Sequence, residues 1–514
     1  MRTIYFIRNA LAGIAGKLLG QLLGFIVRTV FIHTLCQEFL GINGLFTSVL
    51  AFLNLSELGL GSAIVFALYE PLANDRRDKI CALMDFYKKA YRIIGCATLI
   101  LGICVLPFLD YIIKGDTGAI NIYAVYLLFL TDTVFSYWFW AYKASLLIAA
   151  QKEYIAVGIR NRIDIVKSIV RIVFLILLRN VPIASFYTYT ASGIIFTLIA
   201  NYRINCRVEK EFPFLREDKC SAVSREDRKQ IFQRIIGLST YRISSVVNNA
   251  MDTIIISAMI GVGINGIYSN YTLLISMVNG VLWIVVTAII PGIGNLYARN
   301  EMDRLYEVFK EICVLFFVGY GFCGIVLFTL INPFIGDMWL DYSYLLGRDV
   351  VIACFLNFTT GGILTPFSVL VEATGKFSKR GISSIVSVII NIILSVVLLQ
   401  KCHMGIAGVL LATVVARMVV AVPVYLNIVA KDIFRRRVIS FGVTYILALC
   451  VICVFAVVIN IAISCISLSG FWGVIIKAII CVMLSAGGFA AILVWTSYFK
   501  PLKERIAMLL KKIK

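Results

Sequence analysis

Apolar stretches of about 20 residues recur along the whole chain and alternate with shorter polar segments. A helix of about this length crosses a hydrocarbon core about 30 Å thick, and inside lipid it satisfies its own backbone hydrogen bonds. The pattern therefore predicts an all-α membrane protein with about 14 transmembrane helices. We expect the spans at residues 9–31, 40–66, 92–113, 119–148, 154–178, 182–202, 232–258, 264–291, 310–331, 349–371, 380–399, 405–429, 438–463 and 471–498.

Basic residues are concentrated in every second polar segment. If the N-terminus is cytoplasmic, the even-numbered connections and the C-terminal tail carry most of the loop Lys and Arg residues. The opposite connections carry only Lys114, Arg179, Arg348 and Lys401. Cationic loops stay on the cytoplasmic side of a membrane, and one missed span would invert every later loop. The asymmetry therefore favours this set of spans, with both termini in the cytoplasm.

The composition agrees with a membrane protein and gives no sign of a cofactor. The chain is 61% hydrophobic and 15% charged, whereas a soluble domain has about 25% charged residues. Its net charge of +20 is explained by cytoplasmic loops, so we expect no nucleic-acid partner. The CxxC pair, Cys450 and Cys453, lies in an apolar run, and His33 and His403 are far apart in the sequence. We therefore predict no metal site.

Two similar strings indicate an internal duplication. Residues 40–46 read LGINGLF and residues 262–268 read VGINGIY, and each string opens a span that is followed by a similar polar loop, at 71–80 and 295–305. The copies are separated by six predicted spans, an even number, so both have the same orientation. This arrangement predicts two six-helix lobes related by an axis along the membrane normal.

The duplication and the loop lengths predict the domain organisation. We expect an N-lobe at 1–203, a cytoplasmic linker at 204–231, a C-lobe at 232–430, two further spans at 431–499 and a basic cytoplasmic tail at 500–514. Two parallel lobes usually enclose a cleft, and rocking about that cleft gives alternating access. Little extramembrane chain remains for a catalytic domain. The organisation therefore favours a transporter over an enzyme.

Charged residues inside the fifth span form a polar stripe. Arg160, Asp164, Lys167 and Arg171 follow one another at helical spacing, so they share one face of the span. Such residues are costly in lipid and normally face a cavity or a partner. Further cations in predicted spans are Lys17, Arg28, Arg242 and Arg417.

Carboxylates inside the spans are fewer than these cations. The candidate partners are Glu57, Asp132 and Asp252. The surplus of positive charge predicts a cationic, water-filled cavity for an anionic substrate. The alternative is that the stripe pairs with neighbouring carboxylates and only locks the helix bundle together.

A polar cluster in the seventh span is a candidate site for a coupling ion. Asp252 follows Asn248 and Asn249, and a carboxylate beside amides could bind a proton or sodium ion. Glu57, between glycines of the second span, is a second candidate for coupling or gating. The alternative for both is hydrogen bonding between helices.

Two longer strings carry a family resemblance. LYEPLANDRRDKICALMDFYKKAYRIIG at 68–95 and MDTIIISAMIGVGINGIYSNY at 251–271 resemble the polysaccharide branch of the multidrug/oligosaccharidyl-lipid/polysaccharide (MOP) exporter superfamily, the Wzx-like flippases of O-antigen and capsule repeat units. The resemblance covers nearly the whole chain. It implies a MATE-like fold with a V-shaped cavity between the lobes, in the cytoplasmic membrane of a bacterium.

The resemblance also implies a cargo. That cargo is an oligosaccharide linked to undecaprenyl pyrophosphate, which moves from the cytoplasmic to the outer leaflet for surface polysaccharide biosynthesis, with membrane lipids, a polymerase and glycosyltransferases as partners. The pyrophosphate would need the cations above, because arginine presents a planar fork to phosphate oxygens. The candidate glycan contacts are Tyr241, Asn248, Tyr268, Asn270 and Tyr271.

Three other functions stay open. A lipid II flippase also binds a pyrophosphate and is poorly separated by sequence. A cation-coupled multidrug exporter would more often have an acidic cavity. An integral-membrane glycosyltransferase or polymerase would need paired catalytic carboxylates and usually a large external loop, and neither is found in the sequence.

Overall fold

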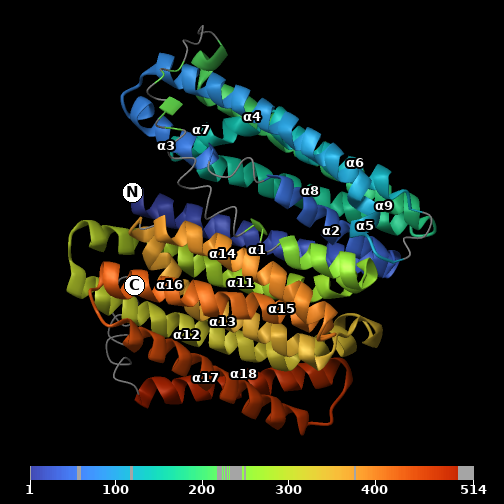
Figure 1. Ribbon diagram of the computed structural model, residues 1–514. Helices are drawn as coiled ribbons and strands as arrows, with labels where there is room; N and C mark the ends of the chain where they lie inside the picture. The colour runs from blue at the N-terminus through green and yellow to red at the C-terminus, as the bar shows by residue number, and fades with distance from the viewer. Residues whose placement is uncertain are drawn as a thin grey trace. The chain divides into compact units, whose positions relative to one another are not determined.

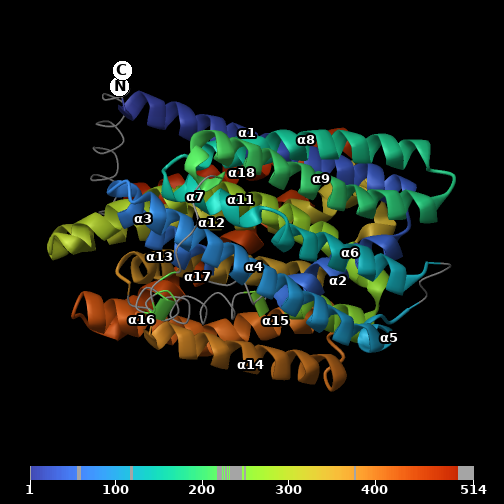
Figure 2. The same cartoon turned by 90° about the horizontal axis from the view of Figure 1, so that it is seen from above.

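The computed structural model describes residues 2–54, 60–115, 120–216, 223, 225, 228–229, 231, 246–247, 250–375 and 378–495, and within them it contains helices but no strand. Its contacts divide the chain into two units, Met1–Ser269 and Asn270–Lys514. Figure 1 and Figure 2 show that each unit consists of long helices lying side by side.

The first unit contains most of the N-terminal helices. They are α1 (Arg2–Thr34), α2 (Gln37–Leu53), α3 (Leu60–Ala73), α4 (Arg77–Val105), α5 (Leu109–Ile112), α6 (Ile122–Trp138), α7 (Ala144–Ala149), α8 (Glu153–Leu177), α9 (Pro182–Glu211) and the π-helical η5 (Ile256–Ile260). The long α11 (Val262–Ala298) begins in the first unit and continues into the second.

The second unit contains the remaining helices. They are α12 (Met302–Pro333), α13 (Arg348–Ala373), α14 (Ser378–Gln400), α15 (Gly405–Ala416), α16 (Val422–Asn427), α17 (Val438–Ser464) and α18 (Gly470–Trp495), with π-helical segments η6 (Phe334–Trp339), η8 (Arg417–Ala421) and η9 (Ile428–Ile433).

Many of these helices can cross a membrane. In the described part of the chain, nine are long and apolar enough to do so, and the bent pair Ile122–Trp138 and Ala141–Ala149 raises the number to ten. Shorter apolar helices, such as Gln37–Leu53, accompany them. The prediction of an all-α, multi-pass membrane protein is confirmed, and a total of about 14 spans is consistent with these helices without being fixed by them.

Glycines bring α4 and α6 close together in the first unit. A Cβ at Gly95 would lie 2.4 Å from Nε1 of Trp138, and one at Gly102 would lie 2.4 Å from Cδ1 of Leu130. Residues seven apart on α4 thus offer a smooth face to α6, as small residues do between membrane helices. The hydroxyl of Tyr126 adds a hydrogen bond to the Gly102 carbonyl, at 3.0 Å.

The two copies of the repeated string touch each other within the first unit. A Cβ at Gly41 would lie 1.8 Å from the carbonyl oxygen of Val262, and one at Gly266 would lie 2.3 Å from that of Gln37. The side-chain amide of Asn265 donates to the Gly41 carbonyl at 3.4 Å. The glycines of the repeat therefore have a physical role, since they let the N-terminal parts of α2 and α11 pack backbone against backbone.

The core of the second unit is formed mainly by α12, α13, α17 and the segment of α16 and η9. Glycines again permit close packing: a Cβ at Gly362 would lie 2.1 Å from the ring of Tyr320, and one at Gly321 would lie 2.6 Å from the ring of Phe489. The lobe boundaries at 203 and 232 stay predictions: residue 203 lies inside α9, and 217–222 and 232–245 lie outside the described residues.

Candidate functional site

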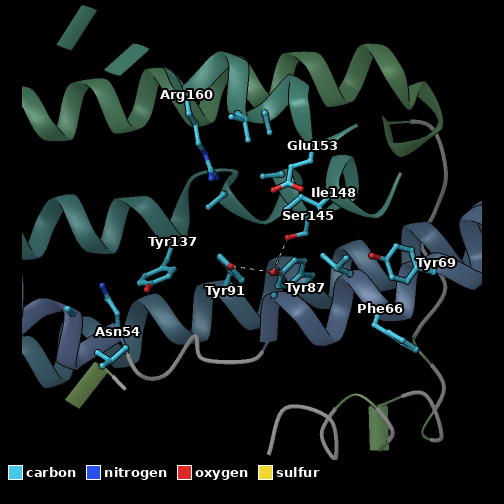
Figure 3. Close-up of a pocket in the computed structure, with 18 residues that line it drawn as sticks. Asn54, Phe66, Tyr69, Tyr87, Tyr91, Tyr137, Ser145, Ile148, Glu153 and Arg160 are labelled. Atoms are coloured by element: carbon cyan, nitrogen blue, oxygen red, sulfur yellow. Dashed lines mark hydrogen bonds between the residues drawn. The ribbon is translucent and has the colours of Figure 1, made fainter. Parts of the chain in front are cut away.

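A cavity of about 860 Å³ lies in the first unit, where α2 ends and where α3, α4, α6, α7 and α8 come together (Figure 3). A second cavity, of about 320 Å³, lies beside it. The two share the lining residues Tyr91, Tyr137, Ala141 and Arg160. The two cavities are therefore adjacent, and Arg160 lies in the wall between them.

Tyrosines form one wall of the larger cavity. Tyr87 and Tyr91 lie one turn apart on α4, and Tyr137 comes from α6. The Tyr91 ring packs edge-on against the other two, with centroids 4.7 Å from Tyr87 and 5.7 Å from Tyr137. The Tyr87 hydroxyl lies 3.2 Å from both the Tyr91 hydroxyl and Ser145 Oγ. The three tyrosines are almost fully buried, with at most 5% of their surface exposed, so this wall is a packed aromatic cluster in which the Tyr87 hydroxyl is bonded to protein groups.

Two further features of this cavity suit a polar ligand with apolar faces. On α3, Phe66 and Tyr69 are exposed, with their rings 6.0 Å apart. At the end of α2, the side-chain oxygen of Asn54 is buried and has no hydrogen-bond partner among the residues that the structure describes. A buried polar atom without a partner is costly, so a water or a ligand group would stabilise it.

The polar face of α8 forms the opposite wall. Arg160, Asp164 and Lys167 all line the smaller cavity, as their spacing predicts, and Glu153 and Arg160 line the larger one. Figure 3 shows Arg160 extending from its helix toward the tyrosines. The fourth member of the stripe, Arg171, lines neither cavity.

Charges around the cavities are partly compensated. Lys167 forms an ion pair with Asp164, one turn earlier on α8. Arg160 forms no ion pair with any carboxylate in the described part of the chain. Of the charged lining residues described, two are negative (Glu153, Asp164) and two positive (Arg160, Lys167), so they carry no net charge. The cation available to an anionic ligand is therefore Arg160.

Arg171 is held by its neighbours on α9. Its Nε donates to Ser192 Oγ at 3.0 Å, and its guanidinium carbon lies 4.1 Å from the centroid of the Tyr189 ring. Asp132 Oδ2 and the Arg171 guanidinium lie 3.1 and 3.2 Å from the place that a Cβ at Gly193 would take. This arrangement fits the alternative that part of the stripe joins helices, because Arg171 is occupied by protein groups.

Other predicted site residues are dispersed. Arg28 donates to the hydroxyl of Ser269, and Asp252 is buried, with 9% of its surface exposed. Several candidates lie outside the described residues, namely Glu57, Tyr241, Arg242, Asn248, Asn249 and the side chain of Lys17.

Arg417 and Tyr271, both in the second unit, make several hydrogen bonds. Arg417 donates to the carbonyl and side-chain oxygens of Asn357 and to Thr360 Oγ1, at 2.7–2.8 Å. The Tyr271 hydroxyl donates to Asn332 at 2.6 Å and accepts from the Leu346 amide at 2.9 Å. Both side chains are therefore held in place by the protein.

The tyrosine wall was not predicted from the sequence. Tyr87 and Tyr91 have i, i+4 spacing in the segment DFYKKAYRIIG, which places them on one helical face. That spacing was a usable signal. The contribution of Tyr137 depends on the packing of α6 against α4, which the sequence does not give.

No protein-family model and no curated protein matches the chain at a significant level. Solved structures do match it. The lipid II flippase MurJ, in an inward closed conformation, is similar with a TM-score of 0.68 at 17% identity, over 94% of this chain and 98% of MurJ.

MATE transporters match over slightly less of the chain. A multidrug resistance MATE family transporter of the MOP superfamily, in an inward-facing conformation, has a TM-score of 0.59 at 15% identity, over 79% of this chain and 93% of that one. A point mutant of the Vibrio cholerae MATE transporter VcmN has a TM-score of 0.54 at 12% identity, over 82% of this chain and 96% of that one. At these identities the likeness concerns the fold. The chain therefore has the fold that MurJ and the MATE transporters share.

Proposed function

We propose that the chain is a flippase that moves a lipid-linked oligosaccharide from the cytoplasmic to the outer leaflet of a bacterial cytoplasmic membrane. The observation that carries this proposal is the cavity that places Arg160, which has no ion-pair partner among the described residues, opposite Tyr87, Tyr91 and Tyr137. Its substrate class follows from that pairing of a cation with hydroxyl-bearing aromatic rings. The reaction makes and breaks no bond.

The cation suits the pyrophosphate of such a lipid. A guanidinium donates two parallel hydrogen bonds to phosphate oxygens, and charge-assisted bonds of this kind are about twice as strong as neutral ones. Lys167 lines the adjoining cavity, and an arriving diphosphate would compete with Asp164 for its ammonium. Arg160 can therefore bind the diphosphate directly. Lys167 can bind it only by giving up its ion pair with Asp164.

The exposed aromatic rings of the larger cavity suit the sugars. Aromatic rings pack against the apolar faces of pyranose rings, and Phe66 and Tyr69 are the exposed rings that line this cavity. Asn54, whose buried oxygen has no partner among the described residues, adds an acceptor. A cavity of about 860 Å³ falls in the size range of sites for ligands of a few hundred daltons, so it would hold a short segment of the headgroup while the polyprenyl tail stays in the lipid.

The membrane potential provides a driving force. Moving one negative charge outward across an inside-negative membrane is favoured by about 2.3 kcal/mol per 100 mV. Asp252, buried in the first unit, is the candidate group if a proton or sodium ion is coupled to transport. In this proposal alternating access exposes the headgroup in turn to the two sides of the membrane.

A second function, lipid II flipping, is favoured by the similarity to MurJ over 98% of its length. Both cargoes can be tested in one system. The protein is reconstituted into liposomes with fluorescently labelled lipid II or a labelled undecaprenyl-pyrophosphate oligosaccharide, and a membrane-impermeant quencher reports the fraction that reaches the outer leaflet. We expect flipping of the oligosaccharide lipid and no rescue of cells depleted of their lipid II flippase.

The assay distinguishes the two cargoes, and it can also exclude both of them. Faster flipping of lipid II, together with rescue of the depleted cells, would replace the proposal by its alternative. Transport of neither lipid, with the protein correctly folded and inserted, would contradict it.

A further inference from the structure

A strongly basic pocket lies in the second unit, apart from the cavities described above. Its volume is about 630 Å³, and it lies where η9 turns into α17. Its lining combines basic side chains with aromatic rings: Lys431, Arg435, Arg436, Arg437, Tyr306 and Phe441.

A left-handed turn gathers the basic side chains. Arg435 has a φ of 53°, a conformation that glycine adopts without cost and that most other residues avoid. The turn is closed by the amide of Arg436, which donates to the Ala430 carbonyl at 2.7 Å. As a result, Lys431 and the run from Arg435 to Arg437 line the same pocket.

An aromatic ring orients the cations without neutralising them. The guanidinium carbon of Arg436 lies 3.9 Å from the centroid of the Tyr306 ring, and Lys310 Nζ lies 4.9 Å from it. Tyr306 is in turn fixed edge-on against Phe434, with centroids 5.0 Å apart. A cation–π contact leaves the positive charge of Arg436 available to an anion.

The positive charge of this pocket is not cancelled by ion pairs. None of Arg435, Arg436 and Arg437 is paired with a carboxylate in the part of the chain that the structure describes. All three are exposed. The pocket is thus built to attract an anion with several negative oxygens.

The position of the pocket identifies the kind of anion. The segment that carries the three arginines connects two candidate membrane spans, Gly405–Ile433 and Val438–Ser464, so we expect the pocket at the membrane–water interface. From Ile439 onward, α17 exposes an apolar stripe at i, i+4 and i+7, through Val443 and Ile446. A ligand that fits both features has an anionic phosphate head and an acyl tail.

We propose that this pocket binds the phosphate of an anionic phospholipid, with an acyl chain along the apolar stripe of α17. Free phosphate has the same negatively charged oxygens, but it has no acyl chain that could contact the apolar stripe. Anionic headgroups are attracted to cations at the membrane surface, and each cation strengthens binding about fivefold. Loss of three cations should therefore weaken binding about 100-fold.

The test uses the full chain, purified in mild detergent and analysed by native mass spectrometry. Dioleoyl-phosphatidylglycerol is added to the wild type and to the triple variant Arg435→Gln, Arg436→Gln, Arg437→Gln. We expect saturable binding to the wild type and about 100-fold weaker binding to the variant. A matched control removes three exposed cations elsewhere, with Arg179→Gln, Arg348→Gln and Lys401→Gln, and should bind like the wild type.

Further arms identify the source of the phosphate. Tyr306→Leu keeps every charge but removes the ring that orients Arg436, and should weaken binding about threefold. Dioleoyl-phosphatidylcholine should not bind, and millimolar inorganic phosphate should not displace the phosphatidylglycerol. Displacement by phosphate would overturn the lipid assignment, as would equal binding of phosphatidylglycerol to the two triple variants.

Discussion

Replacing Arg160 and Arg171 one at a time should separate a ligand-binding cation from a structural one. Both residues lie on the same face of α8, eleven positions apart, so the sequence predicts the same role for them. In the structure their surroundings differ, because Arg160 lines both cavities and Arg171 lines neither. The two alanine variants are therefore expected to fail in different ways.

Arg171→Ala should destabilise the protein. It removes a hydrogen bond to Ser192, of about 1 kcal/mol, and a cation–π contact with Tyr189, of about 1 kcal/mol. It also removes one of the two positive charges near the carboxylate of Asp132, next to Gly193, the other being Lys167. Together these losses come to about 3 kcal/mol, and they should appear as a lower Tm in a thermal unfolding scan that follows tryptophan fluorescence in detergent.

Arg160→Ala should leave stability unchanged within about 0.5 kcal/mol, because Arg160 has no ion-pair partner among the described residues. Under the proposed function it should instead weaken binding of an undecaprenyl-pyrophosphate oligosaccharide by about 2 kcal/mol, or about 30-fold, the value of a charge-assisted hydrogen bond. Titration of the purified protein with the labelled lipid measures this. Arg160→Lys keeps the charge but loses the fork, so its affinity should be intermediate.

Arg160→Ala should therefore change affinity but not Tm, and Arg171→Ala should change Tm. Arg162→Ala, on the same helix but outside both cavities, is the matched control and should resemble the wild type in both assays. Normal affinity in Arg160→Ala would refute the assignment of a phosphate-binding role. An unchanged Tm in Arg171→Ala would show that its contacts with α9 contribute nothing to stability.

Further predictions concern the tyrosine wall, the repeat contact and a buried ion pair. Tyr87→Phe removes a fully buried hydroxyl that is bonded to Tyr91 and Ser145, so unfolding should become about 1–2 kcal/mol easier in a denaturation series. Gly41→Ala should lower Tm because its Cβ has no space, whereas Gly158→Ala, with nothing within 4 Å, should not. Lys143→Ala removes the ion pair with Glu209, 2.8 Å long and largely buried, so unfolding should become about 2 kcal/mol easier in a denaturation series.

Fold class was predictable from the sequence because one physical requirement dominates it. Stretches of about 20 apolar residues are long enough to cross a membrane, and in the described part of the chain nine helices, or ten with the bent pair, have the required length and composition. The sequence showed only that the two repeated strings share their glycines. The structure explains why glycine is needed there, because Gly41 and Gly266 each lie against the backbone of the other copy.

The candidate site was predictable in part. The helical spacing of Arg160, Asp164 and Lys167 correctly placed them on one face, and the structure puts that face at a cavity. The spacing also allowed the pairing of Lys167 with Asp164, which the comparison of total charges overlooked. The opposite wall comes from other helices, so no pattern within α8 could indicate it.

Counting charges overestimates how cationic a membrane cavity is, because a guanidinium does not need a carboxylate to be satisfied. Arg417 is held by the neutral oxygens of Asn357 and Thr360, and Arg171 by a hydroxyl and a ring. Neither arginine is therefore evidence for an incoming anion. A cation that lines a cavity and has no such acceptor among the described residues does point to one. In the first unit Arg160 meets that condition, so the case for a phosphate-bearing cargo depends on this side chain far more than on the net charge of +20.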